Sequence, residues 1–333
     1  MSARPATAEE IKHTSPGSFV LSTLRSSPVF ILLIVILLAT ATVTPAVLSP
    51  SNIMQVLRQY SVMGIMALGV TFVILCGRLD VSVGSLLSLL VVVIVALHDI
   101  IGPIGAMLAG LGIALVVGAI NGFLVAYLRL NSLITTLGMF AALQGVANVT
   151  AAGGLQLVKN PETSWFGFFG RAFVLGVPVP VWLLFGIAAL AAWVLAWTNF
   201  GRAVRAVGGN ELASRYSSID AKAIIFVCYL AAAVLTAVAA IILSSRAMSA
   251  QSDSGAGLEI VVLSAIFLGG TSLGGGVGGI GRTLLGVVVL AFISNAMVLV
   301  GFPIQAQWLV SALVILLAIW LDAATRRGTA FVI

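Results

Sequence analysis

Residues 81–128 read VSVGSLLSLLVVVIVALHDIIGPIGAMLAGLGIALVVGAINGFLVAYL, and Asp99 is the only charged residue among them. A helix needs about 20 apolar residues to cross a membrane, so this stretch is long enough for two crossings. We therefore predict one span at 81–97 and another at 102–128, with Asp99 between them. In the second span a small residue recurs at every fourth position, which lets another helix approach closely: Gly110, Ala114, Gly118 and Gly122.

The rest of the chain has the same character. Hydrophobic residues make up 61% of the 333 residues and charged residues only 8%, whereas ordinary soluble domains carry roughly 25% charged residues. The predicted fold class is therefore an all-α polytopic membrane protein with about ten transmembrane helices, a short cytoplasmic helix and broken helices near Gly-rich turns. The uncharged intervals place the spans at 29–48, 54–76, 81–97, 102–128, 132–152, 180–198, 222–245, 258–273, 280–300 and 304–322.

The distribution of Lys and Arg predicts the orientation. Ten spans put both termini on one side, and basic residues accumulate in cytoplasmic loops. A cytoplasmic N-terminus gives twelve Lys and Arg residues inside and four outside, namely Arg58, Lys159, Arg171 and Arg246. We expect a cytoplasmic tail at 1–28, a transmembrane domain at 29–322 and a cytoplasmic tail at 323–333. The net charge of +6 reflects this bias, so we expect no nucleic-acid partner.

The first apolar segment has an alternative interpretation. VFILLIVILLATA (29–41) ends in small residues and resembles a signal peptide with a cleavage site. The long preceding tail and the apolar residues after Ala41 favour an uncleaved span. Cys76 and Cys228 lie in or beside predicted spans with no disulfide or metal spacing, and we interpret them as small buried residues.

Two motifs in the chain could carry chemistry. CGRLDVSVGS (76–85) places Asp80 between two spans. Asp80 is either the N-cap of the following helix or part of a discontinuous helix beside a solute path. GGTSLGGGVGGIGRT (269–283) formally contains G-x-G-x-x-G at Gly276, Gly278 and Gly281. Because membrane spans flank it and no βαβ unit surrounds it, we predict a close-packed turn rather than a dinucleotide site.

Other enzyme and carrier signatures are weak. The chain has no G-x-x-x-x-G-K-[ST] motif, so it cannot bind ATP in the P-loop manner. Intramembrane carboxylates are typical of ion-coupled carriers. Here the acidic residues near the membrane all fall at predicted span ends, namely Asp80, Asp99, Glu259 and Asp322, and only Glu259 is a candidate for membrane depth. His13 falls in the tail and His98 at a span end, so we expect no Ser–His, metal or intramembrane-protease site.

The stretch GRAVRAVGGNELASRYSSID (201–220) is unusually polar for this chain. Gly208 and Gly209 should end the preceding helix, and Asn210 is a good N-cap with Glu211 in the favourable first turn. We predict an amphipathic helix of about ten residues. On one face lie Leu212, Tyr216 and Ile219, and on another Glu211 pairs with Arg215. Such a helix either lies on the inner leaflet or docks into a groove of a protein partner.

With these motifs, the chain resembles the permease subunits of ABC importers of the ribose type, which transport monosaccharides and related small polar solutes. The resemblance covers about residues 50–322. It rests on four motifs in order: LDVSVGS (79–85), INGFLVAYLRLNSLITTLGM (120–139), FGRAVRAVGGNELASRYSSI (200–219) and LEIVVLSAIFLGGTSLGGGVG (258–278). The chain departs from the family at Ser218, where glycine is usual, and at Arg282, which also replaces a glycine. Such departures fit a heterodimer of two diverged permeases.

The resemblance implies the function and the partners. Two permeases, identical or related, form a pore in the bacterial inner membrane, a cytosolic ATPase subunit binds ATP and Mg²⁺, and a periplasmic solute-binding protein delivers the solute. The permease itself then has no catalytic residue, metal or bound cofactor. The resemblance also implies that the polar helix is the coupling helix, which contacts the ATPase. The residues that we assign to coupling are Gly201, Arg202, Gly208, Gly209, Asn210, Glu211, Leu212, Ala213, Arg215, Tyr216 and Ile219.

The solute path is less well marked by the sequence. Candidate lining residues are Asp80, Ser82, Ser85, Asn121, Thr135 and Thr136. A stand-alone secondary carrier for a small polar solute is the alternative function, and a channel or scaffold without energy coupling is a third. The sequence does not identify the sugar, because selectivity in such a system lies mostly in the delivery protein.

Overall fold

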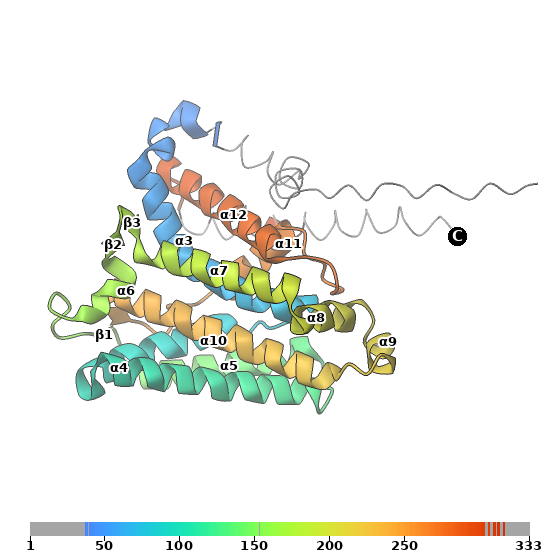
Figure 1. Cartoon of the computed structure of the whole chain (residues 1–333). Helices are drawn as coiled ribbons and strands as arrows, with labels where there is room; N and C mark the ends of the chain where they lie inside the picture. Colours follow the sequence, from blue (N-terminus) through green and yellow to red (C-terminus); the bar gives the residue numbers. More distant parts are fainter. Residues whose placement is uncertain are drawn as a thin grey trace, which may run out of the picture.

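The computed structural model describes residues 37–38, 40–152 and 154–303, together with a few positions between 306 and 316. The predicted tails 1–28 and 323–333 lie outside the described residues, as do residues 29–36 and 39 of the predicted first span and most of the predicted last span. Within the described part, long helices pack side by side along a common direction (Figure 1). The chain is therefore described below from the helix at Pro50 to the helix that ends at Val300.

The elements follow one another with short connections. The helices are η1 (Pro45–Leu48), α3 (Pro50–Leu75), α4 (Val83–Ala126), α5 (Ser132–Thr150), η2 (Trp165–Gly167), α6 (Phe168–Arg171), α7 (Val179–Trp197), α8 (Asn199–Gly209), α9 (Glu211–Tyr216), α10 (Ala221–Ala247), α11 (Leu258–Leu268) and α12 (Ile280–Val300). Four two-residue strands form two antiparallel pairs: β1 (Gln156–Leu157) with β4 (Ser249–Ala250), and β2 (Phe173–Val174) with β3 (Val177–Pro178).

Six of these helices are long and apolar enough to cross a membrane: α3, α4, α5, α7, α10 and α12. This confirms a multi-pass helical membrane protein. The full count of ten spans stays a prediction, because the predicted span 304–322 falls largely outside the described residues and the predicted span 29–48 falls partly outside them.

Helix α4 is a hairpin of two helices rather than one straight rod. Gly102 interrupts its 44 residues with a φ of 76°, a conformation that glycine adopts without strain. Pro103 follows and starts the second half, where a proline is well tolerated. A Cβ added to Gly110 would lie 3.0 Å from the Cδ1 atom of Ile94, so the two halves run back along each other. The two spans predicted at 81–97 and 102–128 are thus confirmed.

Gly118 and Gly122 in the second half of α4 face helix α10, which packs against both α4 and α3, whereas Gly110 faces the first half of α4. A Cβ added to Gly118 would lie 2.7 Å from the Cβ atom of Ala233, and one added to Gly122 would lie 3.1 Å from the carbonyl oxygen of Phe226. The predicted role of this stripe in close packing is confirmed. Close approach matters here because lipid offers no hydrophobic driving force, and van der Waals contact must hold the helices together.

Helix α11 is shorter than predicted. It ends at Leu268 and not near 273, and 11 residues rise only about 16 Å, roughly half of a membrane. The segment 251–257 before it is built of turns, and the N–H of Gly255 donates to the Oγ atom of Ser88 at 2.8 Å. Gly255 of this segment is therefore packed against α4, whereas Gln251, Asp253 and Ala256 are exposed.

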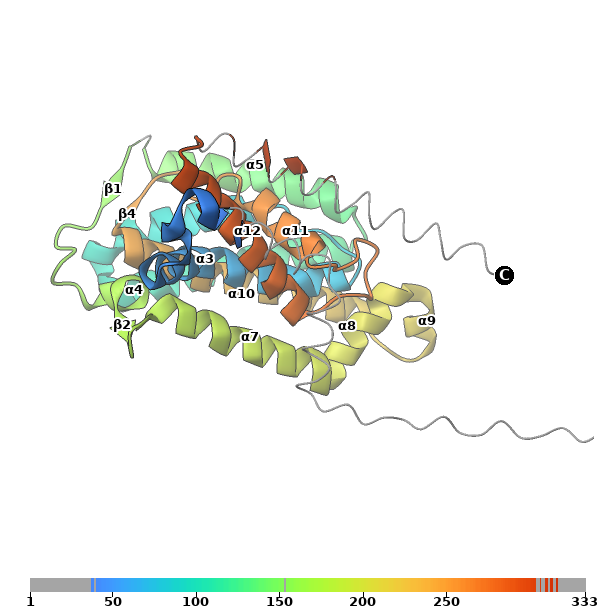
Figure 2. The same ribbon diagram turned by 90° about the horizontal axis from the view of Figure 1, so that it is seen from above.

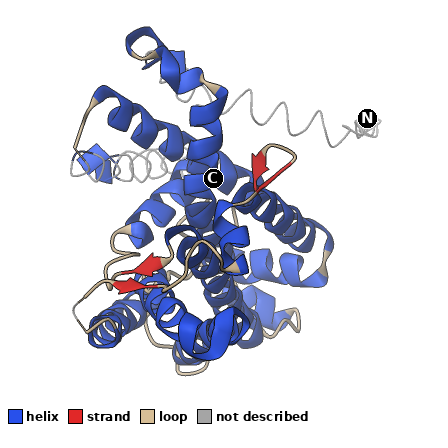
Figure 3. Ribbon diagram, turned by 90° about the vertical axis from the view of Figure 1, so that its left-hand side faces the viewer, coloured by secondary structure: helices blue, strands red, loops and turns tan. Residues whose placement is uncertain are grey.

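The bundle has two distinct ends (Figure 2). The strand pairs lie at one end, which Figure 3 views directly with the strands in red, and α8 and α9 lie at the other. Cations predicted to lie outside gather at the strand end, where Arg171 donates to the carbonyl oxygen of Arg246 at 3.0 Å. Cations predicted to lie inside gather at the end with α9, where Arg78, Arg129 and Arg215 line one cavity. The structure thus groups the loops as the charge pattern predicts.

Candidate functional site

Helix α8 leads from the bundle toward its polar end. The Oγ1 atom of Thr198 caps it by accepting from the N–H of Gly201 at 3.2 Å. Val204 and Val207 are buried, while Arg202 is exposed. Gly201 packs so closely on the last carbonyl groups of α7 that a Cβ would overlap the carbonyl oxygen of Leu195. A side chain at position 201 would therefore push α8 away from α7.

Backbones of three segments meet where α8 ends, at a contact that we call the glycine junction: Gly77, Gly208, Gly275 and Gly276. A Cβ on Gly208 would overlap the carbonyl oxygen of Leu75, and the N–H of Gly276 donates to that same oxygen at 2.9 Å. A Cβ on Gly275 would lie 2.7 Å from the nitrogen of Gly77. The end of α3, the end of α8 and the loop 269–279 are thus joined without intervening side chains.

This contact explains the glycine-rich motif. Gly275 and Gly276 have φ values of 83° and 73°, which side-chain-bearing residues adopt only at a cost. Arg205 adds a further tie, since its Nη1 atom donates to the carbonyl oxygen of Gly278 at 3.1 Å. The motif is a close-packed turn before α12, as predicted, and it also touches the end of α8.

Helix α9 begins as predicted and ends early. The Oδ1 atom of Asn210 accepts from the N–H of Ala213 at 2.9 Å, which confirms the N-cap. The helix stops after six residues at Tyr216, so the predicted length of about ten is wrong. The reason is local: Ser218 is left-handed with a φ of 60°, and the N–H of Ile219 donates back to the carbonyl oxygen of Ser214 at 3.1 Å, which closes the helix end.

The exposed face of α9 consists of Leu212 and Tyr216, whose exposures are 68% and 91%. Both belong to the predicted apolar ridge. Ile219, the third predicted member, lies beyond the helix and lines a different cavity together with Phe200 and Ala203. Its assignment to the ridge is therefore wrong, because the early helix end turns it back toward α8.

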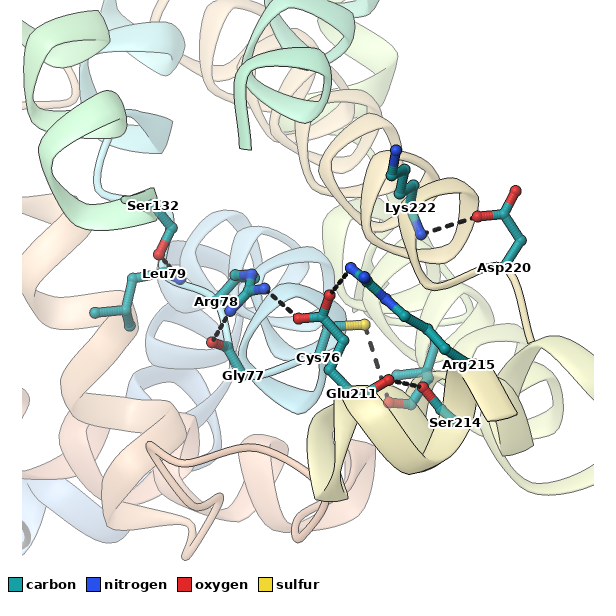
Figure 4. Close-up of polar contacts among 11 residues, drawn as sticks. Cys76, Gly77, Arg78, Leu79, Ser132, Glu211, Ser214, Arg215, Asp220 and Lys222 are labelled. Carbon is teal, nitrogen blue, oxygen red and sulfur yellow. Dashed lines mark hydrogen bonds and ion pairs between the residues drawn. The ribbon is translucent and has the colours of Figure 1, made fainter. Parts of the chain in front are cut away.

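Glu211 holds α9 against the bundle (Figure 4). Its Oε1 atom lies 2.5 Å from Nη2 of Arg215, the pair that the sequence predicts. Its Oε2 atom lies 2.6 Å from Nη2 of Arg78 in the connection between α3 and α4. Sequence spacing does not indicate the Glu211–Arg78 pair, since these residues are 133 positions apart. The sequence predicts only that both lie on the same side of the membrane. Glu211 therefore links α9 both to itself and to the first half of the bundle.

The helix after α9 is capped by the last residue of the predicted coupling segment. The Oδ1 atom of Asp220 accepts from the N–H groups of Lys222 and Ala223 at 3.0 Å and 3.2 Å. Because α10 starts directly at this cap and runs through the centre of the bundle, any displacement of α9 is carried to α10 by a connection of only four residues, 217–220.

Five of the six candidate path residues form one polar cluster. Asp80 is 4% exposed, and its Oδ1 atom accepts from the N–H of Ser82 at 2.9 Å and from its hydroxyl at 2.6 Å. Asn121 donates to the Oγ atom of Ser82 at 2.9 Å. The hydroxyl of Ser85 donates to the carbonyl oxygen of Ser82 at 3.0 Å. The residue that caps α4 is Ser82, so Asp80 is not itself the N-cap.

The remaining path candidates lie on α5. Thr136 is buried, and its Oγ1 atom accepts from the N–H of Val81 at 3.2 Å, which brings it to the edge of the cluster. Thr135 is half-buried on the same helix turn. The cluster surrounds the non-helical connection 76–82 between α3 and α4. Its members form hydrogen bonds inside the protein, as a break in a membrane helix requires, except that Oδ1 of Asn121 has no partner among the described residues.

Glu259 is buried inside the protein, whereas its depth in the membrane stays a prediction. It is 6% exposed, and its Oε2 atom has no hydrogen-bond partner among the described residues. A Cβ on Gly84 would overlap that oxygen, so the carboxyl group touches the first turn of α4. The two cysteines are also buried, with their Sγ atoms 3.4 Å apart, which agrees with their interpretation as small core residues.

His98 makes contacts that the sequence does not indicate. Its Nε2 atom lies 2.8 Å from the Oγ atom of Ser164 and its Nδ1 atom 2.8 Å from Oδ1 of Asp99. These contacts are structural, and the expectation that the chain has no Ser–His site stays a prediction. The imidazole is 6% exposed and stacks near the ring of Phe166, so it fastens the strand-end loop to the turn of α4. Within the described ranges, no group of three His, Cys, Asp or Glu side chains could hold a metal ion.

Comparison with known proteins places these features in a family. Residues 52–319 match the family described as the permease component of the branched-chain amino acid transport system. The ribose import permease of Escherichia coli strain K12 is 40% identical over 295 residues, which cover 88% of this chain and 92% of that protein. No solved structure matches the chain.

Two further relatives match the chain over a similar length. The ribose import permease of Bacillus subtilis strain 168 is 37% identical, over 88% of this chain and 91% of that protein. The L-arabinose ABC transporter permease of Azospirillum brasilense is 33% identical, over 89% of this chain and 87% of that protein. The similarity includes the coupling segment, the buried polar cluster and the glycine junction, since all lie within residues 52–319.

Proposed function

The chain belongs to this family of transport-system permease components, and we propose that it is the membrane-spanning subunit of an ATP-driven importer for a monosaccharide or related small polar solute. A separate ATPase, which binds ATP and Mg²⁺, acts at the end of the bundle that carries α9. A periplasmic binding protein delivers the solute at the strand end, and a second permease completes the pore. Both termini are cytoplasmic, in a bacterial inner membrane.

The observation that carries the proposal is the exposed ridge of α9. Leu212 and Tyr216 project from a helix that is otherwise fastened to the bundle by Glu211. Full burial of one such apolar side chain contributes about 1.5–3 kcal/mol. Two of them are too few to keep the six-residue helix α9 in the lipid headgroup region, because its other residues are mostly polar. A groove in a protein partner fits this ridge better, because fixed side-chain anchors are how short helices are recognised.

The contacts of α9 provide a route for movement. A push on α9 reaches the connection between α3 and α4 through the Glu211–Arg78 pair. It reaches the loop 269–279 through the glycine junction, where no side chain can absorb it. It reaches α10 through the capped connection at Asp220. These three contacts act on different parts of the bundle, so a single displacement of α9 can rearrange the helices around the buried polar cluster.

The polar cluster supports a small hydroxylated solute. Asp80, Ser82 and Asn121 supply hydrogen-bond groups where the chain is broken, and Oδ1 of Asn121 has no partner among the described residues. Hydroxyl-rich solutes need such groups to replace water. The relatives named above import ribose and L-arabinose, which supports a monosaccharide as the solute.

A secondary carrier driven by an ion gradient is the second candidate. The buried carboxyl group of Glu259, with one oxygen unpartnered among the described residues, favours it, because such groups bind the coupling ion in carriers. This candidate requires no protein to read α9.

Uptake measurements distinguish the ATP-driven importer from the secondary carrier. We expect Tyr216→Ala combined with Leu212→Ala to abolish uptake of labelled pentoses in cells that also produce the ATPase and the binding protein, and to abolish co-purification of the ATPase. Trp197→Ala is a matched control, because Trp197 is an exposed aromatic residue at the same end of the bundle. Undiminished uptake by the double variant would reject the coupling role, and uptake that needs no ATPase and collapses with an ionophore would establish the carrier.

A further inference from the structure

A cavity of about 510 Å³ lies beside α9, between the end of α4, the start of α5 and the connection that follows α3. Three of its lining residues are arginines, Arg78, Arg129 and Arg215, and one is acidic, Glu211. Figure 4 shows Glu211 between Arg78 and Arg215. Three positive charges against one negative leave a net charge of +2 in the wall. The cavity is therefore suited to an anion.

The positive charge of Arg129 is not neutralised by an acidic residue among those that the structure describes. Glu211 neutralises part of the charge of Arg78 and Arg215, whereas Arg129 forms no ion pair with any residue that the structure describes. Its φ is 56°, a left-handed conformation that costs a long side chain roughly 1 kcal/mol or more and that glycine adopts freely. An arginine kept at such a position indicates that its guanidinium group is used.

The start of α5 adds to the attraction. Asn131 and Ser132 line the cavity, and they form the N-terminus of a 19-residue helix. Helix N-termini carry a partial positive charge and favour phosphate groups. Guanidinium groups bind phosphate oxygens in pairs, so the arginines and the helix end would act on the same group.

The rim of the cavity is apolar. Leu130 and Leu212 line it and are exposed, and Ile134, one turn into α5, is 71% exposed. A free anion would make no favourable contact with this apolar rim, whereas the acyl chains of a lipid would cover it. Basic pockets between membrane helices at the cytoplasmic surface are recognised sites for phospholipid headgroups. We propose that this cavity binds the phosphate group of an anionic phospholipid whose acyl chains lie along the exposed side of α5.

The inference goes beyond the transport function, because it assigns the lipid to the wall that also contains Glu211. A phosphate at Arg129 and Arg215 would brace α9 against α4 and α5, and it would leave Tyr216 free to contact a partner, because Tyr216 does not line the cavity.

Native mass spectrometry of the purified full chain tests the proposal, with phosphatidylglycerol and phosphatidylcholine as probes. We expect phosphatidylglycerol to bind more tightly, and Arg129→Gln to weaken its binding about fivefold, the effect of one surface cation on an anionic lipid. Arg129→Gly should do the same while relieving the backbone strain, so a loss of binding there cannot come from unfolding. Arg282→Gln removes a charge from an exposed arginine outside the cavity and should leave binding unchanged.

Four results would overturn the proposal. Equal binding of both lipids would show that the cavity does not select the lipid with a net negative charge. Equal weakening by Arg129→Gln and Arg282→Gln would indicate a diffuse surface effect. Displacement of the lipid by inorganic phosphate alone would assign the site to a free anion. Unchanged lipid binding by Arg129→Gln, together with loss of ATPase co-purification, would assign the cavity to acidic side chains of a protein partner.

Discussion

Helices α9 and α11 are both too short to cross a membrane, yet their surroundings are opposite. In α9, Leu212 and Tyr216 are exposed and the helix is held by a cap and by the ion pairs of Glu211. In α11, Val262 and Ala265 are fully buried and the helix is held by packing against α12 and α3. The difference shows that α11 is part of the bundle, and it agrees with the proposal that α9 docks into a partner. Substitutions in α9 should therefore affect transport, and those around α11 should affect folding.

The largest effect is expected where α12 supports α11. A Cβ on Gly286 would overlap the carbonyl oxygen of Ala265, so Gly286→Leu should lower the free energy of unfolding by about 3 kcal/mol, the upper range for overpacking. The amount of monodisperse protein extracted from membranes measures it. Gly281→Leu is the control on the same helix, because nothing lies within 4 Å of a Cβ there. Equal yields for the two variants would show that α11 is not held by close packing.

A smaller effect on stability and a larger one on transport are expected in α9. Glu211→Gln removes the charge from both ion pairs, and partly exposed pairs contribute at most about 1 kcal/mol each. We expect uptake to fall several-fold while the unfolding temperature changes little. Glu162→Gln is the matched control, since Glu162 pairs with Arg171 at 3.7 Å at the strand end. If both variants lose uptake equally, the ion pairs of α9 have no special role.

The smallest effect concerns the end of α9. Ser218 occupies a left-handed position with a φ of 60°, where glycine is unstrained. Ser218→Gly should raise the free energy of unfolding by up to about 1 kcal/mol. Ser217→Gly should lower it, because Ser217 has a φ of −88°, which a serine adopts without strain. Thermal unfolding of the purified variants measures both changes, and a loss of stability in Ser218→Gly would contradict the assigned conformation.

Local features could be predicted from the sequence. Asn210 caps α9 as its type and position indicate, the Glu211–Arg215 pair follows from helical spacing, and charge patterning divided α4 into two spans at Asp99. Small residues at a spacing of four identified the face that meets α10. Each of these depends on residues close together in the chain, where periodicity and capping chemistry act.

Features that join distant segments could not be predicted. Arg78 pairs with Glu211 and His98 contacts Ser164 only because the fold brings them together. The extent of α11 was missed for another reason. Hydropathy does not show where such a helix ends when the residues that follow it, GGTSLGGGVGG (269–279), are glycine-rich and uncharged. The early end of α9 depends on the backbone of Ser218, whose left-handed conformation serine does not favour.

The most direct test asks which side of the membrane α9 faces. Both native cysteines are buried, so Tyr216→Cys supplies the one accessible thiol among the described residues, and a membrane-impermeant maleimide can report its position. Leu175→Cys, at an 89% exposed residue of the strand end, is the opposite control. The account predicts that intact cells label position 175 alone, that inside-out vesicles label position 216 alone, and that bound ATPase protects position 216. Labelling of position 216 in intact cells would contradict it.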